Sequence, residues 1–296
     1  LTASLPGMTA LRVLDVGHCG LGDEGSAALL DALPAAGLRE LNLSGNSAGS
    51  GALRALGRAA ERLGSLESLD LSFNYQAPQG FGPALAPLRR LRRLTLMYCE
   101  LDDDSTAVLA REGLARLEGL EMLDLSNNHR INQRGWRQLA RGLGARGRAS
   151  LRVLVLAECF GLNRGGLAAL LGAPLASLRV LGLWSLRDPE ACAVLEAALS
   201  EGRLPALRLL HLEDTPLRRE LATALRGTSV EEMEVFGGGT VAPAAAGALG
   251  AALAHMPRLR KLDVLAGGPN VNPDAVAAGH DALAAALAAG ARAAAP

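Results

Sequence analysis

Residues 120–128 read LEMLDLSNN, and residues 38–46 read LRELNLSGN. Both follow the pattern Leu-x-x-Leu-x-Leu-x-x-Asn, in which leucine alternates with other residues through the middle of the segment. Such alternation predicts a short strand with one buried face. Because the segment recurs along the chain, it predicts the architecture as well as the local structure.

The pattern occurs ten times, at intervals of about 28 residues. The copies begin at Leu11, Leu38, Leu66, Leu91, Leu120, Leu151, Leu178, Leu207, Val230 and Leu259. In the first six copies the ninth residue is Cys or Asn, which we call the ladder position. In the last four it is Leu186, Thr215, Gly238 and Gly267, so the late copies are recognised by leucine spacing alone.

Each copy continues with 15 to 20 residues whose apolar positions recur at helical spacing, as at Leu53, Leu56, Ala60 and Leu63. A single strand and helix cannot bury their apolar faces alone, so successive copies must stack. We therefore predict an α/β solenoid, or horseshoe, of about ten repeats. Because helices are wider than strands, the parallel β-sheet should line the concave face and the helices the convex face.

We expect one domain over residues 1–296. Residues 1–10 resemble the end of a preceding repeat, because LTASLPGM parallels LLDALPAA around Pro34. Residues 11–273 hold the repeats, and the Ala-rich segment 274–296 is expected to form a capping helix and a tail. Since the chain opens on Leu1 and not on Met, we expect a fragment of a longer protein.

The composition excludes several classes of partner. Thirty basic residues balance thirty acidic ones, so no net field attracts the molecule to nucleic acid or to an anionic membrane. No run approaches the roughly 18 apolar residues of a membrane span. The four cysteines, Cys19, Cys99, Cys159 and Cys192, lack the close pairs of a zinc site or a disulfide framework. A cytoplasmic, intracellular location is therefore predicted.

The period near 28, the alternation of Cys and Asn at the ladder position, and the helical segments 25–33 and 135–143 resemble the ribonuclease-inhibitor subtype of leucine-rich repeats. The resemblance covers about residues 11–290. This subtype includes ribonuclease inhibitors, NOD-like receptors and Ran GTPase-activating proteins. The activity that the resemblance implies for all of them is protein binding.

No residue pattern points to catalysis, a cofactor or a metal. Cys19, Cys99 and Cys159 occupy ladder positions, where a small side chain should turn inward, and Cys192 falls on the buried face of a helix. Trp136 is likewise expected in the core. The five histidines show no paired-ligand spacing. The glycines of 237–239 lack the Lys of a phosphate-binding loop. We therefore predict a protein that is not an enzyme.

The concave face should be acidic. Because the leucines of each strand point into the core, the third, fifth and seventh residues should point outward, with the eighth at the edge. These positions supply ten acidic residues: Asp15, Glu40, Asp70, Asp124, Glu158, Glu213, Asp214, Glu232, Glu234 and Asp263. They supply two basic ones, Arg93 and Lys261. Arginine recurs at the second position, which should form a basic rim: Arg12, Arg39, Arg92, Arg152, Arg179, Arg208 and Arg260.

Some outward positions are apolar in adjacent repeats, where strands lie about 4.8 Å apart, and should form one patch. A patch with Trp and flanking polar residues is typical of a protein-binding hot spot. The predicted patch and its flanks are Val153, Val155, Val180, Trp184, Leu209, His211, Glu213, Asp214 and Phe236. A second aromatic pair, Phe73 and Tyr98, lies on the third and fourth repeats.

The leading hypothesis is a non-catalytic module that binds a protein with a basic surface on its concave face. Nucleic acid and membrane are not expected as partners, and the oligomeric state is left open. The alternative is a regulator of a small GTPase, similar to the Ran-activating proteins. For that role Asn128 and Arg130, just beyond the fifth predicted strand, are the candidate residues.

Overall fold

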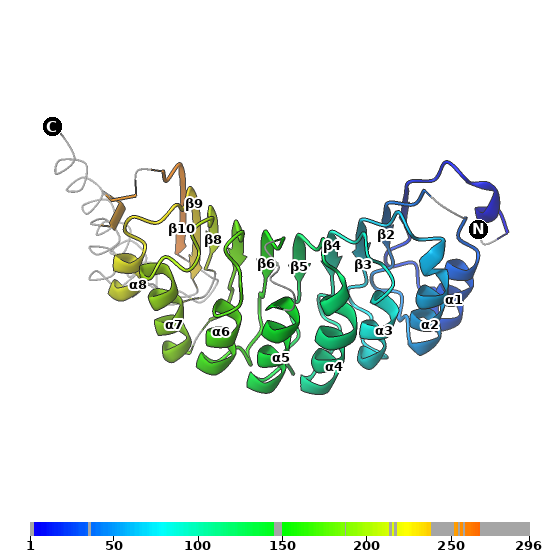
Figure 1. The fold of residues 1–296 in the computed structure, drawn as a ribbon, viewed down its shortest axis with the longest axis horizontal. Coiled ribbons are helices and arrows are strands. Elements are labelled where there is room, and N and C mark those ends of the chain that lie inside the picture. The colour runs from blue at the N-terminus through cyan, green and yellow to red at the C-terminus, as the bar shows by residue number, and fades with distance from the viewer. Residues whose placement is uncertain are drawn as a thin grey trace.

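The computed structural model shows a curved stack of strands and helices, which confirms the predicted solenoid (Figure 1). It describes residues 3–34, 37–144, 150–186, 188–212, 215, 218–237, 252–253, 255–256 and 258–266, of which 235–237 and 264–266 are described in backbone only. The predicted capping segment, 274–296, lies outside these residues. At the N-terminal end a short 3₁₀ turn, η1 (Leu5–Gly7), packs the buried Leu5 against the first repeat.

One parallel sheet contains ten strands in the order of the chain. The strands are β1 (Val13–Asp15), β2 (Glu40–Asn42), β3 (Ser68–Asp70), β4 (Arg93–Thr95), β5 (Met122–Asp124), β6 (Val153–Val155), β7 (Val180–Gly182), β8 (Leu209–His211), β9 (Glu232–Gly237) and β10 (Lys261–Ala266). The core residue is aligned from strand to strand, as Leu94, Leu123 and Leu154 show. These leucines are fully buried, so the leucine spacing sets the register.

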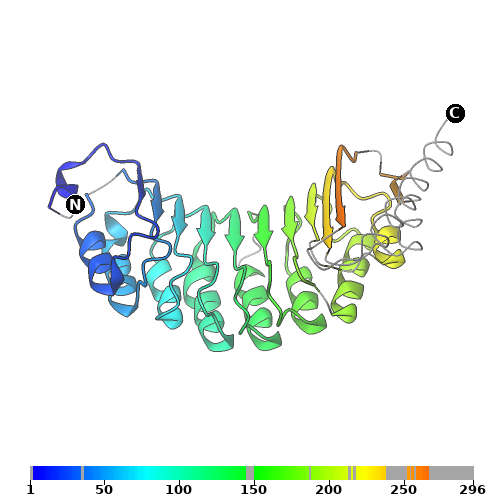
Figure 2. The same cartoon turned by 180° about the vertical axis from the view of Figure 1, so that it is seen from behind.

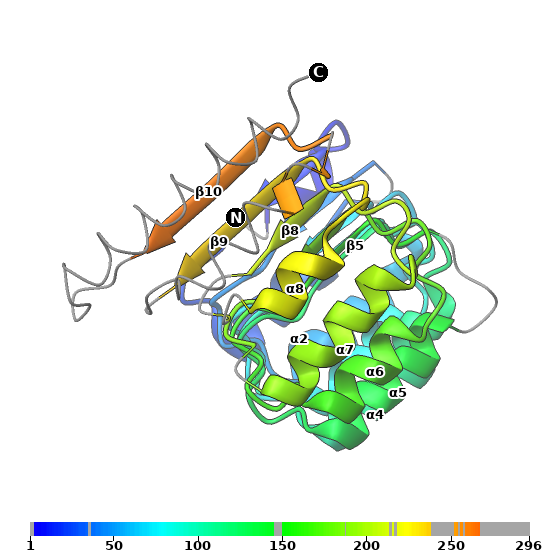
Figure 3. The same ribbon diagram turned by 90° about the vertical axis from the view of Figure 1, so that its left-hand side faces the viewer.

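The α-helices of the described residues all lie on the convex side of the sheet (Figures 2 and 3). They are α1 (Gly22–Asp31), α2 (Ser50–Arg58), α3 (Phe81–Leu85), α4 (Asp103–Val108), α5 (Gln133–Gly144), α6 (Arg164–Leu171), α7 (Pro189–Ser200) and α8 (Arg219–Ala224). Close stacking depends on small residues. A Cβ at Gly142 would lie 2.8 Å from the backbone oxygen of Ala110, so only Gly allows α5 to approach the preceding unit this closely.

Two outer segments differ from the long helix that the periodicity predicts. Helix α2 ends at Arg58, and Ala60 and Leu63 lie beyond it, although both are buried as predicted. In the third repeat α3 has only five residues. Pro78 and Pro87 flank it, and a proline both lacks the backbone donor and disfavours helix in the residue before it.

The ladder asparagines join neighbouring repeats. In the fifth repeat Nδ2 of Asn128 donates to the carbonyl oxygens of Leu96 and Leu125, each at 2.8 Å. Its Oδ1 accepts from the backbone N–H groups of Cys99 at 3.1 Å and Leu101 at 3.0 Å. One buried side chain therefore satisfies backbone groups of two successive turns.

Two of the ladder cysteines are buried as predicted, and the third is not. Cys99 and Cys159 donate from Sγ to the carbonyl oxygens of Leu71 and Leu125 in the preceding repeats. Cys19 is exposed, and its Sγ reaches only the carbonyl oxygen of Gly17 in its own repeat. The inward orientation predicted for Cys19 was wrong, because β1 is the first strand among the described residues and no earlier described strand covers its turn.

Candidate functional site

Strands β6, β7 and β8 bring together six of the residues predicted to bind a partner. Val153 pairs in register with Val180, and Val180 with Leu209. In the next row, Val155 pairs with Gly182, and Gly182 with His211. The side chains in these two rows are half-buried, so each shows part of its surface on the concave side: Val153, Val155, Val180, Leu209 and His211. We define the concave patch as Val153, Val155, Val180, Trp184, Leu209 and His211.

Trp184 lies just beyond the end of β7. Its ring meets that of His211 edge-on, with the centroids 6.2 Å apart and the planes at 90°. The indole is half-buried, yet its Nε1 is inaccessible and has no hydrogen-bond acceptor among the described residues. A buried donor without a partner costs free energy, and because this N–H is closed off from the surface, a bound molecule would contact the exposed part of the ring and not the N–H.

One neighbour of the patch was missed, and three predicted members are not fully placed. Met122 of β5 pairs with Val153, is half-buried and occupies the same third position of its repeat, which was the available signal. Glu213 and Asp214 lie outside the described residues. Phe236 belongs to β9, but its side chain is not among those described.

Charged residues border the patch on its C-terminal side. Nδ1 of His211 lies 2.6 Å from Oε2 of Glu234, without the alignment of a hydrogen bond. Nζ of Lys261 lies 2.9 Å from Asp263 and 3.0 Å from Glu234, and these hydrogen bonds raise the pKa of Lys261. Since two carboxylates surround the one ammonium, the border is acidic despite Lys261.

The acidic residues of the N-terminal half also have a structural task. At the fifth position of four repeats the side-chain oxygen accepts the backbone N–H two residues on, at 2.8 to 2.9 Å: Asp15, Asn42, Asp70 and Asp124. This Asx turn follows the last residue of β1, β2, β3 and β5. Burial and the nearby charge of Asp70 raise the pKa of Asp124. The concave acids are therefore partly explained by the turn.

The seventh position is largely closed, contrary to the prediction that it points outward. Ser72 and Ser126 are buried, and their hydroxyl groups accept the backbone N–H groups of Met97 and Ala157 in the next repeat. The Asx turn folds this residue against its neighbour, which sequence periodicity does not show. Trp184 is an exception because its ring is too large to be enclosed there.

A row of rings follows the edge of the sheet where the strands end. We define the aromatic row as His18, Phe73, Tyr98, His129 and Phe160. Ring centroids lie 5.7 Å apart for His18 and Phe73 and 5.5 Å for Phe73 and Tyr98. The spacing is 6.3 Å from Tyr98 to His129 and 4.8 Å from His129 to Phe160, the last pair being stacked at 11°. The row therefore extends over six repeats.

Sequence analysis identified Phe73 and Tyr98 but missed the other rings. His18, Phe73 and Tyr98 occupy the eighth position of their repeats, whereas His129 and Phe160 occupy the tenth. In the second repeat the eighth residue is Gly45, and a Cβ there would lie 2.2 Å from Nδ1 of His18. The missing side chain lets the His18 ring reach across to Phe73.

The eighth position has an unusual backbone. Its φ is positive in the first seven repeats, with values of 55° at His18, 58° at Phe73 and 53° at Tyr98. Gly and Asn adopt this left-handed region most readily, whereas a bulky side chain there is strained. Aromatic residues at Phe73 and Tyr98 are thus not the choice that backbone stability alone would favour.

The opposite edge of the sheet carries the predicted arginines, but it is not a continuous basic rim. Glutamate occupies the second position in three repeats: Glu67, Glu121 and Glu231. Glu67 pairs with Arg39 at 3.7 Å, and Glu231 with Arg208 at 3.0 Å. The rim is therefore a mixed edge of seven arginines interrupted by three glutamates, which the count of arginines alone concealed.

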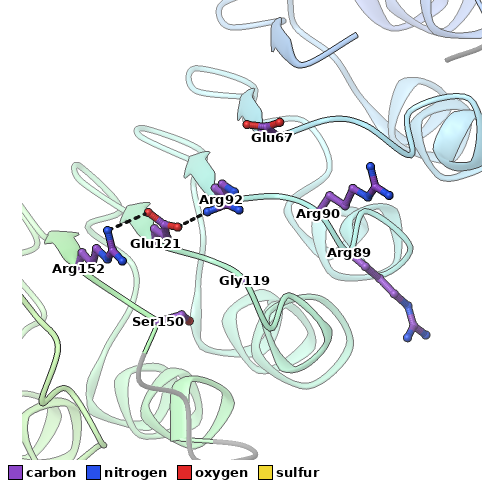
Figure 4. A pocket seen from close by; sticks show the side chains of 8 residues that line it. All are labelled: Glu67, Arg89, Arg90, Arg92, Gly119, Glu121, Ser150 and Arg152. Atoms are coloured by element: carbon purple, nitrogen blue, oxygen red, sulfur yellow. Dashed lines mark hydrogen bonds and ion pairs between the residues drawn. The ribbon is translucent and has the colours of Figure 1, made fainter. Parts of the chain in front are cut away.

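The centre of this arginine edge contains a hollow of about 470 Å³ (Figure 4). Arg92 and Arg152 converge on Glu121 from either side, Arg152 at 3.7 Å, while Arg89 and Arg90 point away from it. Because Glu121 already engages two guanidinium groups, the hollow is not an open anion site. The ion pairs of Glu121 with Arg92 and Arg152 link three successive repeats, and such solvent-exposed pairs contribute little to stability.

Comparisons with known proteins agree with this architecture. A family model described as "Leucine Rich repeat" matches residues 7–30. The structure of the leucine-rich repeat-containing protein LegL7 from Legionella pneumophila superposes with a TM-score of 0.56 at 18% identity, covering 96% of this chain and 94% of that one. This chain has the leucine-rich-repeat fold. The predicted ribonuclease-inhibitor-like subtype stays a prediction.

A second structure, of the Rad7 and Elc1 complex in yeast, aligns with a TM-score of 0.49 at 19% identity, covering 89% of this chain and 77% of that one. No curated protein matches the sequence significantly. Leucine-rich-repeat proteins are generally non-enzymatic scaffolds that bind other proteins. In the part of the chain that the structure describes, no helix is long and apolar enough to cross a membrane. No cluster of three or more candidate metal ligands occurs among the described residues.

The two residues considered for GTPase regulation have other contacts in this leucine-rich-repeat protein. Asn128 is fully buried and its amide is engaged in the ladder, so it cannot reach an attacking water. Arg130 is exposed, and its guanidinium lies 3.7 Å from Glu100. Their arrangement adds no observation in favour of that role.

The thiols should differ in reactivity. Burial raises the pKa of Cys99 and of Cys159 to about 12, and it also raises the pKa of Cys192. Cys19 is exposed. Because the thiolate is the nucleophile, iodoacetamide at pH 8 should label Cys19 at least tenfold faster than the other three in the folded protein. Mass spectrometry of tryptic peptides measures the labelling rate of each of the four cysteines. In the denatured protein, where all four thiols are exposed, the rates should become equal.

Proposed function

We propose that this leucine-rich-repeat protein is a non-catalytic interaction module that holds a protein partner on its concave patch. The observation that carries the proposal is the register of four neighbouring strands. Met122, Val153, Val180 and Leu209 stand side by side in one row, over about three strand spacings or 14 Å. No described residue covers this row, and a continuous apolar row on a monomer's surface is typical of a binding site.

The centre of the patch has the chemistry of an anchor. Trp184 combines a large apolar ring with a donor that lacks an acceptor, and His211 holds the ring edge-on. Trp is among the residues that contribute most to protein interfaces, because its burial removes much apolar area from water. A partner would therefore be held through the exposed part of the Trp184 ring.

The charges along the concave side of the sheet favour a basic partner. Asp15, Asp70 and Asp124 form no ion pair with any described residue. Arg93, the arginine at an outward strand position in that half, is paired with Glu40 at 2.9 Å. On the other side Glu234 and Asp263 outnumber Lys261. Such a field steers a basic protein surface toward the concave side and repels nucleic acid.

Trp184→Ala is expected to weaken partner binding at least thirtyfold, as for a central hot-spot residue. The partner is first captured from native lysate with the wild type and identified by mass spectrometry. The purified partner is then titrated calorimetrically into wild type and variant. Circular dichroism and the thermal midpoint establish that the variant remains folded.

Val153→Asp and Val13→Asp provide a matched pair. Both valines occupy the third position of a repeat and face the same side, but Val13 lies on β1, five strands away from Val153. The proposal predicts loss of binding for Val153→Asp and unchanged binding for Val13→Asp. Equal affinities for wild type, Trp184→Ala and Val153→Asp would place the binding surface elsewhere and end the proposal.

A further inference from the structure

The aromatic row is not required by the core. The chain has two Trp, two Tyr and four Phe, and its core is built mainly from leucine. Four of these eight residues nevertheless gather where the strands end: Phe73, Tyr75, Tyr98 and Phe160. Tyr98 is 39% exposed and Phe160 57%. Tyr98 and Phe160 thus expose aromatic surface to solvent along this edge, where core packing does not require an aromatic residue.

Carboxylates accompany these rings. Asp15 and Asp70 precede His18 and Phe73 by three residues, and Glu158 precedes Phe160 by two. In the Asx turns of Asp15 and Asp70 one carboxylate oxygen, Oδ1, accepts a backbone N–H, and neither group is paired with a basic side chain among the described residues. His18, Phe73 and Phe160 therefore each lie close in the chain to a carboxylate that forms no ion pair with a described side chain.

The tautomer of His129 adds an acceptor to the row. Nδ1 of His129 lies 2.7 Å from the carbonyl oxygen of Glu158. A carbonyl oxygen can only accept, so Nδ1 carries the hydrogen and Nε2 of the neutral ring is free to accept. The row thus combines π faces, carboxylates and an imidazole acceptor, and only a cationic donor with a flat face suits all three.

We propose that the aromatic row binds arginine side chains of the protein partner. The inference rests on the proposed function, because it gives the partner on the concave face an arginine-rich segment that lies along the edge of repeats one to six. A guanidinium group is planar, stacks on aromatic faces and donates two parallel hydrogen bonds to a carboxylate. A lysine ammonium is compact and strongly hydrated, so it should gain less from the same row.

The test uses two synthetic peptides of equal length and charge, one with four arginines and one with four lysines, separated by Gly-Ser spacers. Calorimetry at 0.15 M salt should show at least tenfold tighter binding of the arginine peptide, because several stacking contacts act together. The double variant Tyr98→Leu/Phe160→Leu keeps apolar side chains but removes two π faces. It should bind the arginine peptide no more than twofold more tightly than the lysine peptide.

Two controls separate stacking from other effects. Tyr98→Phe/Phe160→Tyr keeps both rings and should keep the arginine preference. Trp184→Ala alters only the concave patch and should also keep it. Equal binding of the two peptides by the wild type would overturn the inference, and so would tighter binding of a proline-rich peptide of the same length. Loss of the natural partner on Trp184→Ala without any arginine preference would refute the row and leave the proposed function standing.

Discussion

Asn128→Ala is expected to lower the free energy of unfolding by about 3–5 kcal/mol. The substitution removes the acceptor of the backbone N–H groups of Cys99 and Leu101 and the donor to the carbonyl oxygens of Leu96 and Leu125. The site is fully buried, so water cannot replace the lost contacts without opening the turn. Each unsatisfied buried group costs about 1–3 kcal/mol, and the substitution leaves two backbone N–H groups without an acceptor at once.

Asn46→Ala is the informative comparison. Asn46 makes the same set of contacts in the second repeat, accepting from Cys19 at 3.1 Å and Leu21 at 3.2 Å and donating to Val16 at 2.8 Å. The two backbone N–H groups that donate to Asn46 belong to the first repeat and are only partly buried, so water can solvate them after the substitution. Urea unfolding should therefore show a loss at Asn46 at least 1 kcal/mol smaller than at Asn128.

A surface control completes this comparison. Asn132 is exposed, and among the described residues its side chain donates to the carbonyl oxygen of Arg130 alone, at 3.1 Å. Asn132→Ala should change stability by no more than about 0.5 kcal/mol. If all three substitutions cost the same, the ladder does not stabilise the solenoid through buried backbone groups, and the explanation given for the ladder position fails.

The fold could be predicted because its determinants lie close together in the sequence. A leucine at a fixed place in each repeat must be buried, and one-residue slips would expose it, so spacing alone predicts strands, register and sheet order. The buried positions of Trp136 and Cys192 followed from helical spacing in the same way, and both are confirmed. Local periodicity suffices when each repeat contacts only its neighbours.

Other features depended on contacts between repeats that no single pattern contains. Whether Cys19 is covered depends on the strand that would precede β1, and the charge of the arginine edge depends on glutamates in the next repeat. The aromatic row mixes the eighth and tenth positions because the turns differ in path, as Tyr98 and His129 show. Counting residues aligns strands but does not align turns.

The concave side of the sheet and its two edges differ in chemistry, and this gives the sheet a direction for binding. One edge carries arginines interrupted by glutamates, the middle carries acids followed by the apolar patch, and the other edge carries rings. A partner with a basic, arginine-rich segment next to an apolar contact can satisfy the middle and the aromatic edge together. The same partner would meet fixed guanidinium groups at the arginine edge, so only one orientation across the sheet is favourable.

Trp136→Ala is expected to lower the free energy of unfolding by about 3–5 kcal/mol, because a fully buried tryptophan leaves a large cavity. The ring packs against α6 so closely that a Cβ at Gly166 would lie 2.9 Å from Cδ1 of the indole. Its Nε1 is buried without an acceptor among the described residues. The indole therefore contributes by packing while its N–H opposes burial.

Trp136→Phe separates these two contributions. Phenylalanine keeps most of the ring and removes the unsatisfied donor, so the expected loss in urea unfolding is less than half of that for alanine. A loss for phenylalanine equal to that for alanine would mean that the N–H has an acceptor in solution. Helices α5 and α6 lie behind β5 and β6, which carry Met122 and Val153 (Figure 1). Partner binding by the same two variants therefore shows whether the concave patch depends on the core beneath it. Phenylalanine should preserve the register of those strands and hence partner binding, whereas alanine should weaken binding only as far as it loosens the core beneath them.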